Sequence, residues 1–167
     1  MVRTTATALL LLTAACAAGC AKKPVARETA TVHTTAAPVE RNVRVSDELA
    51  RLCKIQFDNV DRAPKFDFDE AALLPADREV LAQVATCVTT GPLKGRELAL
   101  VGRADPRGEV EYNLALGERR ADAVHVYLAQ LGVAPAAMAK TSRGELDAEG
   151  KDEDGWRLDR RVDVRLK

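Results

Sequence analysis

The stretch from Glu97 to Leu131 constrains the fold more than any other part of the chain. It opens with an apolar run, Leu98 to Val101, which is bounded by turn residues and is typical of a central strand. A loop of composition Ala-Asp-Pro-Arg-Gly follows at residues 104–108. From Glu109 the apolar residues recur with a helical period. The apolar line of this predicted helix consists of Gly117, Ala121, Val124, Leu128 and Leu131.

The flanking segments extend this unit to a two-layer α/β sandwich. A short helix is expected after Ser46, whose hydroxyl can cap it, and a longer helix is expected from Pro75 to Gly91. Three further strands are predicted at Pro64–Asp69, Met138–Arg143 and Arg161–Lys167. From Pro64 onward the order is strand, helix, strand, helix, strand, strand. The last strand alternates apolar and charged residues, so helices are expected on one face of the sheet and water on the other.

The N-terminus predicts a secreted lipoprotein. Residues 1–19 read as a lipoprotein signal peptide, because one charge, Arg3, precedes an apolar run too short to cross a bilayer of about 30 Å. A signal anchor or an ordinary core helix is the alternative. The sequence Ala17-Ala18-Gly19-Cys20 resembles a lipobox, which marks Cys20 for acylation, and Cys16 is a second, weaker candidate. Acyl chains would hold Cys20 in a membrane, and Ala21 after it favours the outer one.

Residues 20–45 are interpreted as the lipidated N-terminus and a flexible linker. Thr, Ala, Val and Pro dominate this segment, no helical or strand period persists, and Pro24 and Pro38 would break any helix. The folded domain is therefore predicted to span residues 46–167.

Two of the four cysteines of the chain, Cys53 and Cys87, lie in the predicted domain. Cys53 and Cys87 form an even pair in an oxidising compartment, so they are a disulfide candidate, and two separate buried thiols are the alternative. The bond would stabilise the fold by about 3–4 kcal/mol on the chain-entropy model. No metal site is expected, because His33 and His125 stand apart and no C-x-x-C spacing occurs.

Charge and composition exclude two classes of function. Lys+Arg and Asp+Glu both number 25, so the formal net charge is zero, and aromatic residues make up only 4% of the chain. Both values argue against nucleic-acid binding. The predicted domain contains one histidine, His125, and no nucleophile beside a positioned base, so neither an enzyme nor a cofactor is expected.

Four ordered motifs resemble the OmpA C-terminal family, and most closely its peptidoglycan-associated lipoprotein branch. Leu100–Gly108 reads LVGRADPRG where the family has G-H-x-D-x-x-G. Glu111–Val124 reads EYNLALGERRADAV where the family has Y-N-x-x-L-x-x-x-R-A. Phe66–Asp69 and Asp159–Val162 match further motifs, the second at the position of N-R-R-V. The resemblance covers about Pro64 to Lys167, and it implies a βαβαββ order with a mixed four-stranded sheet.

The resemblance also implies a ligand. The family holds peptidoglycan by meso-diaminopimelate, which carries a free ammonium and a free carboxylate on one carbon, so a pocket needs one anion and one cation. The resemblance assigns these roles to Asp105 and Arg120, and an arginine fork suits a carboxylate. The other residues that it places at the peptidoglycan-binding pocket are Phe68, Asp69, Asn113 and Arg160.

Two residues depart from the family pattern. Arg103 replaces the family histidine, and this extra cation could weaken the attraction of Asp105 for an ammonium or could bind a second carboxylate. Asp159 replaces the family asparagine and could divert Arg160 into an ion pair.

The leading hypothesis is a non-catalytic tether in the cell outer membrane, with lipid on Cys20 at one end and peptidoglycan held by a periplasmic domain at the other. The alternative is an interaction module that binds a periplasmic Tol-type protein, with weak or no wall binding. An assay of wall binding with and without that partner would separate the two.

Overall fold

The computed structural model describes residues 43–56 and 66–167. The predictions for the signal peptide, for Cys16 and Cys20, for the linker up to residue 42 and for the start of the strand predicted at Pro64 lie outside these residues. None of the helices in the described ranges combines the length and the apolar character that a membrane span requires.

The described residues form four strands, four α-helices and one short 3-10 helix. In chain order these are β1 (Val43–Val45), α1 (Asp47–Cys53), α2 (Pro75–Thr89), β2 (Leu98–Arg103), α3 (Val110–Gln130), η2 (Pro135–Ala137), β3 (Met138–Gly144), α4 (Glu153–Asp159) and β4 (Val162–Leu166). The strands form one sheet in the order β1-β4-β2-β3. Pairs β1–β4 and β2–β3 are parallel and β2–β4 is antiparallel, so the sheet is mixed.

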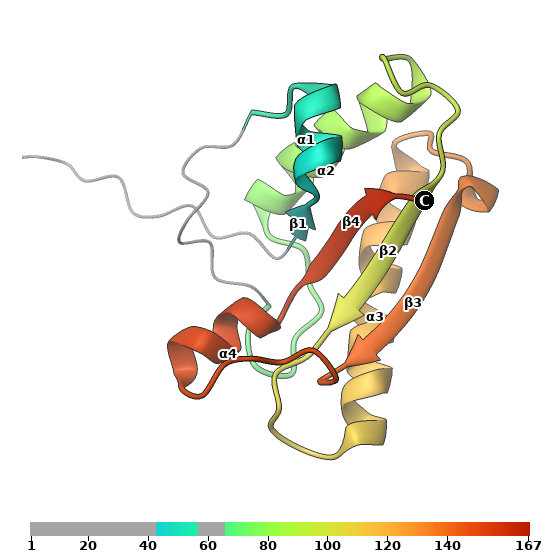
Figure 1. Ribbon diagram of the computed structural model, residues 1–167. Helices are drawn as coiled ribbons and strands as arrows, with labels where there is room; N and C mark the ends of the chain where they lie inside the picture. The colour runs from blue at the N-terminus through green and yellow to red at the C-terminus, as the bar shows by residue number, and fades with distance from the viewer. Residues whose placement is uncertain (1–42, 57–65) are drawn as a thin grey trace, which may run out of the picture. The chain divides into compact units, whose positions relative to one another are not determined.

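Helices and sheet form two layers around one core. In Figure 1 the long helix α3 lies behind the sheet and runs along β2 and β3. The core is built from aliphatic residues of both layers, among them Leu49, Leu81, Val84, Leu98, Leu100, Val124, Leu128, Val162 and Val164. Along β4, Val162 and Val164 are buried while Arg165 is exposed, as the alternating sequence predicts. The predicted two-layer fold with a mixed four-stranded sheet is confirmed.

Local chemistry explains where the first helices begin. The Ser46 side chain accepts a hydrogen bond from the Leu49 backbone N–H, which caps α1 as predicted. Pro75 occupies the first turn of α2. The buried carboxylate of Asp77 accepts hydrogen bonds from the backbone N–H groups of Leu74 (2.9 Å) and Val43 (3.0 Å), and thereby joins α2 to β1.

The first strand is not where the sequence predicted it. Val43–Val45, which the prediction assigned to the linker, pairs with Val162–Val164 of β4, so the fold extends beyond the predicted start at residue 46. Phe66–Asp69, predicted as part of a strand, instead belongs to a turn in which Phe66 is buried and Asp69 has φ 61°. The alternation of aromatic and acidic residues therefore does not mark a strand. It arises because Phe66 packs into the core while Phe68 lies exposed in the turn.

Two smaller differences concern helices. Helix α4 was not predicted, because it has seven residues and no apolar period; the Asp152 side chain caps it by accepting from the Gly155 N–H at 3.0 Å. Leu131, predicted on the apolar line of α3, is exposed because the helix ends at Gln130.

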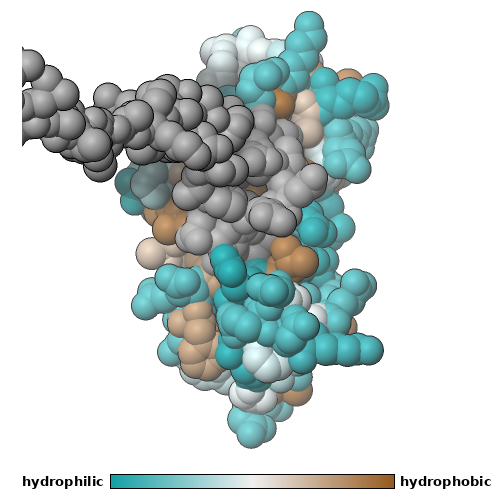
Figure 2. All heavy atoms as spheres, turned by 90° about the vertical axis from the view of Figure 1, so that its left-hand side faces the viewer, coloured by the Kyte–Doolittle hydropathy of each residue, from teal (hydrophilic) through white to brown (hydrophobic). Residues whose placement is uncertain are grey.

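A disulfide joins Cys53, the last residue of α1, to Cys87 in α2, with a Cα–Cα distance of 5.6 Å. Cys53 and Cys87 are the pair that the sequence analysis named as the disulfide candidate, so the alternative of two separate buried thiols does not apply to them. On the side of the molecule that Figure 2 presents, hydrophilic residues dominate outside the grey atoms, and hydrophobic residues appear in small separate groups.

Candidate functional site

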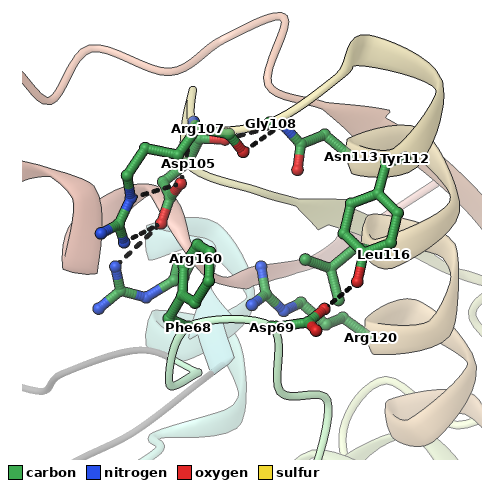
Figure 3. Close-up of a pocket in the computed structure, with 10 residues that line it drawn as sticks. All are labelled: Phe68, Asp69, Asp105, Arg107, Gly108, Tyr112, Asn113, Leu116, Arg120 and Arg160. Atoms are coloured by element: carbon green, nitrogen blue, oxygen red, sulfur yellow. Dashed lines mark hydrogen bonds and ion pairs between the residues drawn. The ribbon is translucent and has the colours of Figure 1, made fainter.

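A small pocket lies where β2 ends and the loop of residues 104–109 leads into α3. It encloses about 70 Å³, which is room for a few water molecules or one small polar head group. Its lining residues come from this loop, from α3, from the turn after Phe66 and from the end of α4. They are Phe68, Asp69, Asp105, Arg107, Gly108, Tyr112, Asn113, Leu116, Arg120 and Arg160 (Figure 3).

All six predicted binding residues line this pocket. The sequence missed Arg107, Gly108, Tyr112 and Leu116, of which Arg107 and Gly108 belong to the predicted loop. The signal that could have found Arg107 is its position two residues after Asp105 in a turn-forming segment.

The side chain of Asp105 is buried, and both of its carboxylate oxygens accept hydrogen bonds. Its Oδ1 accepts from the backbone N–H of Arg107 at 3.1 Å and from Arg107 Nε at 3.2 Å. Its Oδ2 accepts from Arg107 Nη2 at 2.7 Å and from Arg160 Nη1 at 3.0 Å. Burial alone would raise the pKa of Asp105, but the hydrogen bonds from Arg107 and Arg160 outweigh it and lower the pKa. The carboxylate is therefore ionised at neutral pH.

Arg107 lies between two aromatic rings. Its guanidinium carbon is 4.5 Å from the centre of the Phe68 ring and 4.4 Å from the centre of the Trp156 ring. Its Nη1 lies 3.2 Å from a carboxylate oxygen of Glu153, the first residue of α4. Helix α4, which the sequence did not predict, thus supplies one wall and one charge beside the site.

Arg120 holds the pocket wall together from the inside. Its guanidinium donates to the backbone carbonyls of Glu70 (2.8 Å), Arg103 (2.8 Å) and Asp67 (3.2 Å), and its side chain is fully buried. These bonds fix the turn after Phe66 against the end of β2. Burial, aided by the positive charge of Arg160, lowers the pKa of Arg120 to about 10, so the side chain stays cationic at neutral pH.

Arg160 and Asp159 have separate partners. Arg160 donates to the carbonyl of Phe66 at 2.6 Å, to Asp105 and to Glu153 at 2.9 Å. Asp159 instead accepts from the backbone N–H groups of Glu149 (3.1 Å) and Gly150 (2.9 Å). The expectation that Asp159 could divert Arg160 is wrong, because the Asp159 carboxylate binds this loop and its cationic neighbour is Arg161, at 3.8 Å.

Arg103 also lies outside the set of residues that line the pocket. Its guanidinium donates to Asp163 on β4 at 2.6 Å and to Asp147 after β3. Burial would lower the pKa of Arg103, but these two carboxylates raise it. The positive charge of Arg103 is therefore paired with two carboxylates of the domain itself, and these contacts support neither a weakened attraction of Asp105 for an ammonium nor a second ligand carboxylate on Arg103.

Asn113 orders the loop. Its side-chain amide donates to the carbonyl oxygens of Asp105 (3.2 Å) and Arg107 (3.0 Å), which fixes the turn that carries Asp105. On the opposite rim, the hydroxyl of Tyr112 donates to Asp69 (Figure 3).

The lining supplies charges and hydrogen bonds. None of the ten lining residues is Ser, Cys or His, so the pocket presents no nucleophile beside an imidazole base. Across residues 43–56 and 66–167, no group of three or more His, Cys, Asp or Glu is arranged to hold a metal ion.

Known proteins share both the sequence motifs and the fold. The peptidoglycan-associated lipoprotein of Pseudomonas putida is 41% identical over 102 residues, which cover 60% of this chain and 60% of that protein. Outer membrane protein A of Bordetella avium is 35% identical over 103 residues, covering 60% of this chain and 52% of that protein. The matched part thus spans only about half to three fifths of the length of these relatives.

Solved structures of related proteins have the same fold. The crystal structure of the peptidoglycan-associated lipoprotein from Burkholderia pseudomallei matches with a TM-score of 0.58 and 38% identity, over 64% of this chain and 91% of that chain. The C-terminal domain of Helicobacter pylori MotB shares the fold, with a TM-score of 0.56 at 18% identity, over 65% of this chain and 85% of that chain. The family model described as OmpA family matches residues 65–157, which is more than half of the chain. The chain therefore belongs to the OmpA family.

Proposed function

We propose that this protein is an outer-membrane lipoprotein that binds peptidoglycan without covalent chemistry and tethers the outer membrane to the cell wall. The names of its relatives support this proposal, since they include peptidoglycan-associated lipoproteins and an outer membrane protein A. In this proposal Cys20 carries the lipid and the domain lies in the periplasm.

The ligand in this proposal is the diaminopimelate of the stem peptide. The observation that carries it is the meeting of an ionised Asp105 and a cationic Arg120 in one small pocket. Their opposite charges match the ammonium and the carboxylate that diaminopimelate carries on one carbon. Among the residues that the structure describes, Arg120 uses three of its five N–H groups for carbonyls, which leaves two to bind a ligand carboxylate in this proposal.

Weak binding at each pocket is enough for a tether. Many copies on one membrane face a polymeric wall, so each bound copy raises the effective concentration of the others. In this proposal, non-covalent binding by many pockets is enough to hold the outer membrane to the cell wall.

Co-sedimentation with isolated peptidoglycan tests the proposal. We expect the full-length protein in a mild non-ionic detergent to pellet with the wall, and Asp105→Asn and Arg120→Lys to pellet roughly ten-fold less, because each change removes a charge-assisted hydrogen bond or an arginine fork. Asp122→Asn is the matched control, since Asp122 lies on α3 with an exposed carboxylate paired to Lys140.

Circular dichroism must show that each variant is folded, above all Arg120→Lys, whose parent side chain binds three carbonyls. If the wild-type protein stays in solution, the wall-binding proposal fails. Binding to a Tol-type envelope protein, the alternative predicted from the sequence, would then be tested first.

A further inference from the structure

We propose that Arg107 determines the specificity of this pocket by exchanging its ion pair with Asp105 for one with the ligand. An incoming ammonium takes the place of Arg107 on Asp105, and the released guanidinium binds the carboxylate on the same ligand carbon. This inference rests on the proposed function, because it explains how that pocket would select its ligand.

The first step is that Asp105 has no acceptor position to spare. A carboxylate offers about four lone-pair positions. Four donors fill those of Asp105: the backbone N–H, Nε and Nη2 of Arg107, and Nη1 of Arg160. A ligand ammonium can therefore reach Asp105 only by displacing one of these donors.

The second step is that the Arg107 side chain is the donor that can leave. Arg160 has a side chain only 4% exposed, and it is also held by the Phe66 carbonyl and by Glu153. The Arg107 side chain is 33% exposed and donates hydrogen bonds to Asp105 from two of its nitrogens. Figure 3 shows both arginines converging on Asp105 from one side.

The third step concerns where the displaced guanidinium goes. Stacking between Phe68 and Trp156 lets the guanidinium plane slide or turn while its faces stay covered. Once it leaves Asp105 it loses its closest carboxylate, and Glu153, at 3.2 Å, is already shared with Arg160. A ligand that brings its own carboxylate replaces the lost partner, whereas a ligand with an ammonium alone does not.

The pocket should therefore prefer a carbon that carries both charges. Diaminopimelate has such a carbon at its free end. Lysine carries only the ammonium at that position. It would displace Arg107 from Asp105 without giving the Arg107 guanidinium a new carboxylate partner.

Two tripeptides and one substitution test this exchange. The probes are L-alanyl-γ-D-glutamyl-meso-diaminopimelate and L-alanyl-γ-D-glutamyl-L-lysine, titrated by calorimetry into the full-length protein in detergent. We expect the wild type to prefer the diaminopimelate peptide, and Arg107→Gln to lose roughly ten-fold or more of that preference, since one charge-assisted contact to the carboxylate is removed. The variant should bind the lysine peptide at least as well as the wild type does, because the internal competitor for Asp105 is gone.

A matched control and a second readout separate this role from a merely structural one. Arg143→Gln makes the same change at an exposed arginine that pairs with Asp147 outside the pocket lining, and it should keep the wild-type preference. Trp156 is the only tryptophan of the chain, so its fluorescence reports on the stacked Arg107. The diaminopimelate peptide should change this emission in the wild type and much less in Arg107→Gln.

The outcomes are distinguishable. If Arg107→Gln weakens both peptides equally, or leaves their ratio unchanged, the exchange is overturned while the proposed function stands. If the wild type binds neither peptide, the exchange is overturned and diaminopimelate is not the ligand of this pocket, whereas co-sedimentation with whole peptidoglycan decides whether the wall-binding proposal stands. Should Arg107→Gln not fold, Arg107→Lys replaces it, because it keeps the charge and loses the fork; an undiminished preference in that variant would also count against the exchange.

Discussion

At the scale of single residues, Arg120 shows how a side chain expected to bind a ligand also builds the site. Its guanidinium ties the carbonyls of Asp67 and Glu70 to that of Arg103. Removing it would leave three carbonyls without this donor, at a cost of about 1–3 kcal/mol for each that finds no other. Loss of binding in a variant at position 120 therefore has to be separated from loss of structure, whereas Asp105→Asn keeps the shape of the side chain.

The ionisation of Asp105 makes stability depend on acidic pH. Hydrogen bonds from Arg107 and Arg160 overcome the effect of burial and hold the pKa of Asp105 below its ordinary value. The same carboxyl in the unfolded chain has a pKa of about 3.9. The stabilisation is thus fully present above that value, and it is lost as the pH falls from there through the lower folded pKa.

We expect the free energies of unfolding of the wild type and Asp105→Asn to differ by a constant amount between about pH 7 and about pH 5. The difference should shrink below about pH 4, where the wild-type carboxyl begins to be protonated in the unfolded chain. Urea unfolding followed by circular dichroism at several pH values measures it. A difference that stays the same down to the lowest pH would show that ionised Asp105 does not stabilise the fold.

Part of the site was predictable residue by residue. Asp105, Asn113 and Arg120 stand at motif positions, and all of them line the pocket. The contacts of Arg103 and Asp159 were not predictable, because their partners, Asp163, Asp147 and the loop at Glu149, are set by how distant strands and loops pack.

At the scale of elements, helix α3 and strand β2 touch through two glycines. A Cβ built on Gly102 would lie 1.7 Å from the carbonyl oxygen of Gly117, so neither backbone could stay in place. The sequence predicted Gly117 as part of the apolar line of this helix, and the structure shows that its lack of a side chain lets the backbone of β2 come close. This close crossing sets the depth at which Arg120 meets the end of β2.

Gly102→Ala should therefore force α3 away from β2. We expect a loss of about 1–3 kcal/mol in the free energy of unfolding, typical of an overpacked interior, together with weaker co-sedimentation with peptidoglycan. Urea unfolding and the wall-binding assay measure the two effects. Thr141→Ala, at an exposed position of β3, is the control and should stay close to the wild type. Unchanged stability in Gly102→Ala would mean that the crossing has more freedom than these distances allow.

Helix α4 marks where the sequence was least informative. Its seven residues, EDGWRLD, have no apolar period and include Gly155, which is a poor helix former. The helix nevertheless brings Glu153 and Trp156 against Arg107. The second ring beside Arg107 could not be predicted, because only the three-dimensional fold places it there.

At the scale of the whole molecule, the sheet is completed by residues far apart in the chain. Val43 pairs with Val162, and Val45 with Val164. The alternating pattern of β4 was readable, but three residues of β1 are too few to show a period. The layers and most elements could therefore be predicted from local patterns, whereas the first strand depended on a partner near the other end of the chain.

A domain cut at the predicted boundary should be less stable for this reason. A chain that starts at Ser46 loses the buried side chains of Val43 and Val45, and with them about 3–5 kcal/mol of unfolding free energy. Thermal unfolding of this chain should show a lower midpoint than that of a chain that starts at Asn42, one residue before β1. Equal midpoints would mean that β1 contributes little to the sheet.

The position of β1 also has a mechanical consequence. Val43 is in register with Val162, and Val162 is in register with Gly102 near the carboxyl end of β2, so the chain enters the sheet at the same end as the pocket. The Asp77 carboxylate fixes that entry point by accepting from the Val43 N–H. For a protein that links membrane to wall as proposed, tension would enter at Val43 and leave at the pocket. The force would then act across only one end of the sheet. The other end, together with the disulfide that joins α1 to α2, would carry little of it.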